Sequence, residues 1–94
     1  MSTVMRMHWP EVTKDEYERA RKDVNWEGQT PVGAKFHVAW FDETGLNVLD
    51  LWDSPQDFQN FVDKRLMPAV QRIGIKGQPQ VSLAQSHAIF APNV

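Results

Sequence analysis

The spacing of apolar residues along the chain predicts four strands and two helices. Short apolar or alternating runs, bounded by Pro, Gly or charged turn residues, indicate strands over residues 4–9, 34–41, 46–52 and 80–90. Apolar residues at helical spacing indicate helices over about residues 14–23 and 55–73. The expected order along the chain is therefore β-α-β-β-α-β.

Local signals mark where both helices begin. Thr13 and Glu16 form a capping box at the start of the first helix. Ser54 and Pro55 begin the second helix as its N-cap and first helical residue. Pro68 lies inside this helix, and its ring clashes with the carbonyl group four residues earlier. We therefore expect a kink or a split at Pro68.

This order of elements predicts an α+β fold of the ferredoxin-like type. In that arrangement two helices pack on one face of a four-stranded antiparallel sheet. The strand order is expected to be 4-1-3-2. A chain of 94 residues has enough length for one hydrophobic core, so residues 1–94 are expected to form a single domain.

A short loop over residues 42–45 sets the register of the second and third strands. It places Phe41 opposite Leu46 and His37 opposite Asp50, and residues opposite each other share a face. One face is strongly apolar and is expected to meet the helices; it carries Phe36, Val38, Trp40, Leu49 and Leu51. The other face is mixed; it carries Lys35, His37, Ala39, Phe41, Leu46, Val48, Asp50 and Trp52.

The mixed face is too apolar to remain in water, and both helices are already used on the other side. A second copy of the chain is the simplest cover, so we expect a homodimer with a cavity between the sheet and its partner. In the first strand, alternation puts Met5 and Met7 on the helix side and Arg6 on the open side. His87 is placed on the open face, because the small residues that alternate with it suit helix packing.

Composition removes several classes of function. Ten Lys and Arg residues against 12 Asp and Glu give a net charge of −2, which argues against nucleic-acid binding. The longest apolar run is far shorter than the ~20 residues of a membrane span. The first ten residues lack the apolar core of a signal peptide, so a cytoplasmic protein is expected. The absence of Cys excludes disulfides and thiolate metal sites.

Several segments carry a resemblance to a known superfamily. They are the strand end Trp9-Pro10 and the stretches KFHVA, VLDLWDSPQDF, RLMPA and SHAIF, at residues 35–39, 48–58, 65–69 and 86–90. Together they resemble the dimeric α/β-barrel superfamily, and within it the antibiotic-biosynthesis-monooxygenase-like group of small uncharacterised bacterial proteins. The resemblance implies a ferredoxin-like fold and a homodimer that forms an α/β barrel.

The same superfamily contains cofactor-free monooxygenases, polyketide cyclases, hydroxynitrile lyases and haem-degrading enzymes. The resemblance therefore implies chemistry on a small molecule without choosing the reaction. This chain does not match the Asn and Trp residues of the anthrone-type monooxygenases or of the haem degraders.

His37 and Asp50 are the main candidates for chemistry. A carboxylate opposite an imidazole fixes its tautomer and raises its basicity, so His37 is interpreted as a general base and Asp50 as the residue that orients it. His87 is a second acid/base candidate. The alternative is a polar pair in a dimer seam. A metal site of His37, His87 and Asp50 lacks a spacing signature, so neither a metal nor a cofactor is expected.

Three residues are candidates for contact with a substrate: Trp52, Phe41 and His8. Trp52 shares the face of Asp50 and has an aromatic ring that suits a flat ligand. These residues favour a small cofactor-independent acid/base enzyme, of the cyclase, isomerase, lyase or monooxygenase type. Its substrate would be a small aromatic or polyketide-like carbonyl compound. The alternative is a non-catalytic homodimeric module for ligand binding or assembly, which a filled, dry seam would favour over a cavity.

Overall fold

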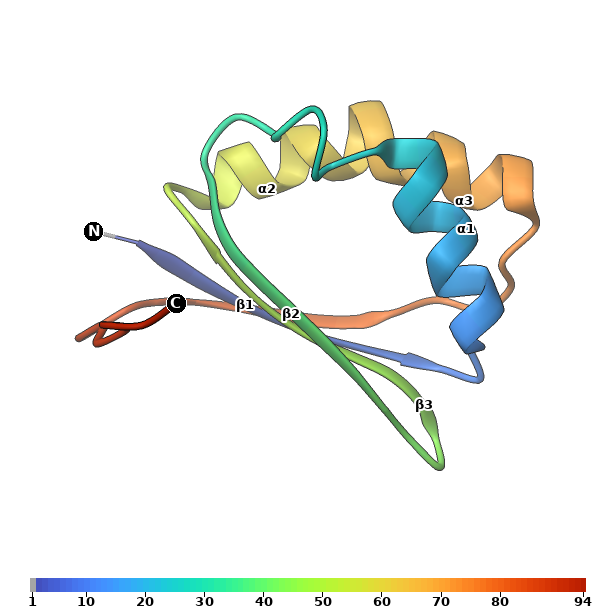
Figure 1. Cartoon of the computed structure of the whole chain (residues 1–94), viewed down its shortest axis with the longest axis horizontal. Coiled ribbons are helices and arrows are strands. Elements are labelled where there is room, and N and C mark those ends of the chain that lie inside the picture. The colour runs from blue at the N-terminus through green and yellow to red at the C-terminus, as the bar shows by residue number, and fades with distance from the viewer. Residues whose placement is uncertain (1) are drawn as a thin grey trace.

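In the computed structural model, which describes residues 2–94, four antiparallel strands form one sheet with the helices on one face (Figure 1). The strands are β1 (Thr3–Pro10), β2 (Ala34–Asp42), β3 (Gly45–Trp52) and β4 (Gln80–Gln85). Their order across the sheet is β2-β3-β1-β4, which is the predicted order 4-1-3-2 from the opposite edge. The predicted ferredoxin-like fold is confirmed.

The helices begin where the capping residues predict. Helix α1 spans Lys14–Val24, and its capping box between Thr13 and Glu16 is present. Helix α2 spans Pro55–Phe61, and the Ser54 hydroxyl accepts a hydrogen bond from the Asp57 backbone N–H. The second helical region continues through the π-helix η1 (Val62–Leu66) into α3 (Met67–Ile73). Figure 1 shows these helices above the same side of the sheet.

The break expected at Pro68 takes the form of a π-helical turn. The Met67 backbone N–H donates to the carbonyl of Val62, five positions back, instead of the usual four. Pro68 has no backbone N–H, and its ring would collide with the Lys64 carbonyl in a regular α-helix. The wider turn removes that clash and lets the helical axis continue.

The β2–β3 hairpin has the predicted register. Phe41 pairs with Leu46 and His37 pairs with Asp50. The strands extend one residue further toward the turn than predicted, to Asp42 and Gly45. At Gly45 the backbone φ is 140°, and a Cβ atom there would lie 2.5 Å from the carbonyl oxygen of Trp9. Glycine therefore allows the hairpin to lie against the end of β1.

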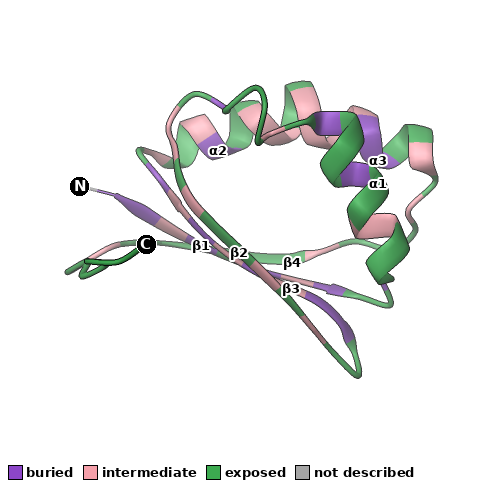
Figure 2. Cartoon of the chain, viewed as in Figure 1, coloured by how far each residue is buried: buried purple, intermediate pink, exposed green. Residues whose placement is uncertain are grey.

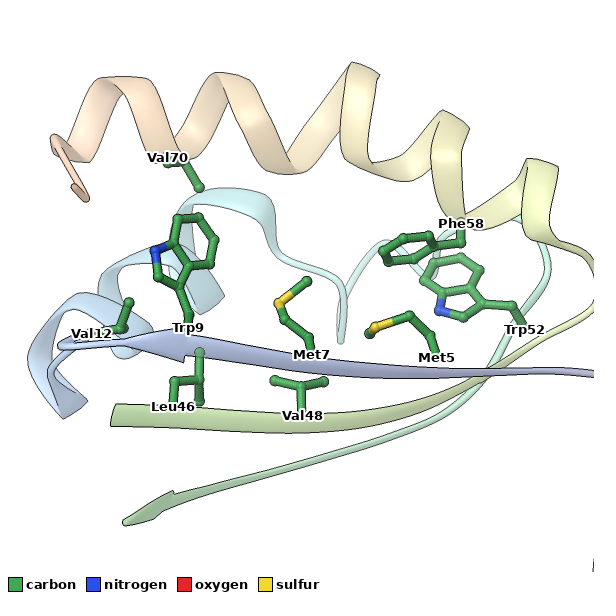
Figure 3. Packing of buried hydrophobic residues seen from close by; sticks show 9 residues of the cluster. All are labelled: Met5, Met7, Trp9, Val12, Leu46, Val48, Trp52, Phe58 and Val70. Carbon is green, nitrogen blue, oxygen red and sulfur yellow. The ribbon is translucent and has the colours of Figure 1, made fainter. Parts of the chain in front are cut away.

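The core lies between the sheet and the helices (Figure 3). Met5 and Met7 point from β1 toward the helices, as predicted. The face assignment for β2 and β3 is wrong, because the mixed set and not the apolar set faces the helices. Its buried members from β3 are Leu46, Val48, Asp50 and Trp52. Pairing explains this result, since β1 aligns Met5 with Asp50 and Met7 with Val48.

The more apolar set of β2 and β3 lies on the side of the sheet without helices. We call this side the outer face; it carries Phe36, Val38, Trp40, Leu49 and Leu51 from these strands. Val38 is 39% exposed and Trp40 is 49% exposed. Figure 2 shows the exposed stretches of β2 that contrast with the buried stretches of β1 and β3. The outer face is therefore the one that lacks a cover within residues 2–94.

The last strand is shorter than predicted. β4 ends at Gln85 and not at residue 90, and residues 86–94 run out beyond the sheet as a mainly exposed tail (Figure 1). Val81 pairs with Met7 and Leu83 with Met5, so these larger residues share the helix side. The placement of the small residues against the helices was therefore wrong. His87 lies in the tail, outside the sheet.

Among residues 2–94, no helix is long and apolar enough to cross a membrane.

Candidate functional site

His37 and Asp50 meet across the β2–β3 pair. His37 Nδ1 lies 2.7 Å from Asp50 Oδ1, which is a direct hydrogen bond. The sequence pattern predicts this pair on the face away from the helices. That prediction is wrong, because both side chains lie on the helix side. The Asp50 side chain is only 9% exposed, while that of His37, on the edge strand β2, is 32% exposed. The carboxylate is the inner member of the pair.

Trp52 holds the other oxygen of the same carboxylate. Its indole Nε1 donates to Asp50 Oδ2 at 3.0 Å, from two residues along β3. A β-strand directs residues two apart to one face, which explains why these side chains meet. An ionised carboxylate offers about four acceptor positions. Two donors therefore orient Asp50 and leave acceptor capacity on both oxygens.

The second ring nitrogen of His37 is held by Tyr17 on α1. Tyr17 Oη lies 2.7 Å from His37 Nε2, and the two ring planes differ by only 4°. Burial raises the pKa of Tyr17 to about 12, against the opposing effect of the Arg21 charge. The phenol therefore stays protonated at neutral pH. Because a carboxylate can only accept, the His37 Nδ1–H donates to Asp50, and in a neutral imidazole Nε2 then accepts from the Tyr17 phenol.

Aromatic rings enclose the imidazole on the side of α1 and the loop that follows it. The ring centroid of Trp26, in the loop after α1, lies 5.3 Å from that of His37 and 5.8 Å from that of Tyr17. Phe41 packs edge-on against Tyr17 at 6.0 Å. These contacts restrict the imidazole to one orientation, in which it faces Asp50.

A cavity of about 260 Å³ lies between the sheet and the helices of one chain. His37, Asp50 and Trp52 form part of its wall, and the rest is mainly apolar, including Met5 and Phe58. The cavity was predicted on the opposite side of the sheet, against a partner. Its position inside the chain follows from the face that His37 and Asp50 occupy.

One charged group other than Asp50 and His37 lines the same cavity. Lys35 is the extra residue of a β-bulge between Ala34 and Phe36, and half of its side chain is exposed. Its Nζ donates to Ser2 Oγ at 2.8 Å and lies 3.2 Å from a carboxylate oxygen of Asp53. The Lys35 ammonium group is therefore paired with Ser2 and Asp53.

The structure separates the other predicted site residues from this pair. His8 lies on the outer face, where Nδ1 bonds Asn47 at 3.0 Å, beside a shallow groove of about 330 Å³. His87 is exposed in the tail. Phe41 contacts Tyr17 and is not part of the cavity wall. Within residues 2–94, no cluster of three metal-ligating side chains occurs.

The sequence interpretation missed Tyr17 as part of the site. A signal for it exists, because Tyr17, Ala20 and Val24 share one face of α1 and that face packs on the sheet. A phenol on a buried helix face needs a hydrogen-bond partner. A histidine on the same side of the sheet is a suitable hydrogen-bond partner for Tyr17. The sequence pattern placed His37 on the opposite face, so this contact was not predicted.

Comparison with solved structures places this fold among small oxygenases and related proteins. SnoaB from Streptomyces nogalater, a cofactor-independent oxygenase, superposes with a TM-score of 0.62 and 12% identity over 94% of this chain and 93% of its own. The monooxygenase ActVA-Orf6 of Streptomyces coelicolor, in complex with nanaomycin D, gives a TM-score of 0.62 and 13% identity over 98% and 92%.

A dimeric ferredoxin-like protein from an uncultured marine organism gives a TM-score of 0.55 and 14% identity, with 96% of this chain and 93% of that chain covered. The fold resemblance is confirmed. At these identities it concerns the fold alone. No protein-family model matches the chain, and no curated protein matches it.

Proposed function

We propose that the protein is a small cofactor-independent acid/base enzyme that acts on a small aromatic or carbonyl compound. The observation that carries this proposal is the hydrogen-bonded pair of His37 and Asp50 at the wall of an apolar cavity. Titratable pairs in such cavities are typical of sites that move protons. A positioned acid or base contributes about 10²–10⁴-fold to a rate.

The size of the cavity limits the ligand. A dry apolar cavity of roughly 150 Å³ binds benzene. On that scale, a cavity of about 260 Å³ suits a compound of one or two fused rings. The ligand-bound monooxygenase among the structural neighbours supports a small-molecule ligand on this fold. Cyclisation, isomerisation, lyase chemistry and oxygenation of an acidic carbon all require removal of a proton, so the pair supports each of them.

The outer face supports an assembly in which two chains pack sheet to sheet. Its exposed apolar residues, among them Val38 and Trp40, lack a cover within residues 2–94. A dimeric protein among the structural neighbours agrees with this arrangement. In such a dimer each chain keeps its own cavity, because the cavity lies on the other side of the sheet.

The test is a screen of one- and two-ring phenols, ketones and aldehydes for binding and for turnover. Tryptophan fluorescence reports binding, because Trp26 and Trp52 line the cavity. Substitution of the pair by His37→Ala with Asp50→Asn should abolish turnover of any substrate found. Asp63→Asn, on the exposed side of η1, is the matched control and should keep full activity. Binding with no turnover of any compound would favour a ligand-binding module.

A further inference from the structure

Both ring nitrogens of His37 already take part in hydrogen bonds, to Tyr17 and to Asp50. Asp50 is therefore the member of the pair that is free to contact a ligand. We infer that Asp50 takes the proton from the ligand and that His37 is a positioning residue. The inference rests on the proposed function and assigns the roles within the same pair. It reverses the roles that the sequence pattern suggests.

The direction of the hydrogen bonds supports this assignment. His37 Nδ1 lies 2.7 Å from Asp50 Oδ1, and His37 Nε2 lies 2.7 Å from Tyr17 Oη. In a neutral imidazole with a carboxylate partner, the Nδ1–H donates to Asp50 and Nε2 accepts from the phenol. Trp52 donates to the same carboxylate at 3.0 Å. An imidazole needs a free lone pair to act as a base, and in His37 that lone pair accepts a hydrogen bond from the Tyr17 hydroxyl. His37 and Trp52 both donate to Asp50, which keeps acceptor positions of its own.

Burial leads to the same assignment. The Asp50 side chain is 9% exposed and lines the apolar cavity, whereas the His37 side chain is 32% exposed at the sheet edge. A carboxylate whose side chain is largely removed from solvent has few water molecules to displace before it accepts a proton from a ligand. His37 holds that carboxylate at a fixed angle, in the way that supporting residues orient catalytic groups.

The chemistry defines the class of substrate. Asp50 would accept a proton from a carbon next to an electron-withdrawing group in a ligand of one or two rings. The C–H bond breaks, the proton goes to a carboxylate oxygen of Asp50, and the electron pair stays in the ligand. The proton returns to the product or passes to water when the product leaves.

A carbon acid of this class exists as a chromogenic probe. Nitrobenzisoxazole has two fused rings and one acidic C–H bond. When a base removes that proton, the electron pair forms the nitrile, the N–O bond breaks, and a coloured cyano-nitrophenolate is released. The reaction needs no cofactor or co-reactant, so kcat/KM depends only on binding of the probe and on the base.

The variants to compare are Asp50→Asn and His37→Gln, with Asp63→Asn as the control. Asp50→Asn should lower kcat/KM by ~100-fold or more. His37→Gln should lower it by ~10-fold, because the Gln amide can still donate a hydrogen bond to Asp50. In the wild type, kcat/KM should rise with pH as the base loses its proton. If the base is Asp50, the same rise should persist in His37→Gln, so this pH profile decides the assignment even if Asp50→Asn fails to fold.

The opposite order would overturn the inference. A His37→Gln variant without activity, beside an Asp50→Asn variant that keeps most of it, makes His37 the base and leaves the proposed function intact. A wild-type rate no higher than that of free acetate and imidazole would contradict the proposed function and the inference together.

Discussion

The indole of Trp52 has a role at the scale of single residues that can be tested without a substrate. Its N–H satisfies one oxygen of the buried Asp50 carboxylate. Trp52→Phe keeps an aromatic ring at this position but is smaller, and it removes that donor. We expect the free energy of unfolding to fall by about 1–3 kcal/mol, the usual cost of an unsatisfied buried acceptor.

Urea unfolding followed by circular dichroism measures this change. Trp26→Phe is the matched control, because the Trp26 indole N–H has no hydrogen-bond partner within the described residues 2–94. A loss as large in Trp26→Phe as in Trp52→Phe would show that packing, and not the hydrogen bond, explains the effect.

Tyr17 gives a second residue-scale prediction, because it is the only tyrosine in the sequence. Its phenolate absorbance should therefore titrate alone, with a pKa raised to about 12 by burial. The folded pKa lies above the ordinary value of about 10, so the fold favours the neutral phenol. Stability from this group should be complete below about pH 10 and should decline as the pH rises toward 12.

The measurement is an ultraviolet pH titration of the folded protein, beside urea midpoints at several alkaline pH values. Tyr17→Phe should remove this part of the alkaline loss of stability. A phenol that titrates near pH 10 in the folded chain would mean that the Tyr17 side chain is not buried as described.

At the scale of elements, local sequence signals predicted where the helices begin and how the hairpin strands pair. They did not predict which face of the sheet meets the helices. The capping residues fixed the helix starts, and the short hairpin loop fixed the pairing of His37 with Asp50, since both depend on neighbours in sequence. Which face of the hairpin meets the helices depends on pairing with β1, which is distant in sequence. The apolar set faces outward, and the polar pair faces the core. Functional sites are where such departures from patterning are expected.

The second helical region supplies a prediction about packing. Both Phe58 and Phe61 line the cavity, but Phe58 is 5% exposed and belongs to the core, whereas Phe61 is only half-buried. Phe58→Ala should cost about 3–5 kcal/mol of unfolding free energy, the range for an emptied aromatic core site. Phe61→Ala should cost less, because part of its ring already faces open space. Equal losses in urea unfolding would place both rings in the same environment.

At the scale of the whole molecule, the exposed apolar face predicts self-association. Two chains packed through their outer faces should have about twice the mass of one 10.8 kDa chain in light scattering at micromolar concentration. Trp40→Asp should give folded monomers, because an unpaired charge in such an interface costs several kcal/mol. Gln71→Asp, on the exposed side of α3, is the control and should remain dimeric. A wild-type monomer would contradict this assembly.

The order of elements and the fold were predictable from the sequence because helical and strand periodicities are local. The cavity was not, because it depends on how far the helices stand from the sheet. Because the cavity lies inside one chain, ligand binding should not depend on dimerisation. A monomeric Trp40→Asp variant should therefore still bind ligands.

The most direct test of a ligand site at Asp50 is a crystal structure of the protein soaked with the cyano-nitrophenol product of the probe reaction. We expect ligand density in the cavity between the sheet and the helices of a single chain, with a polar atom within hydrogen-bond distance of Asp50. Density in the groove on the outer face beside His8, or a cavity filled by side chains, would contradict it.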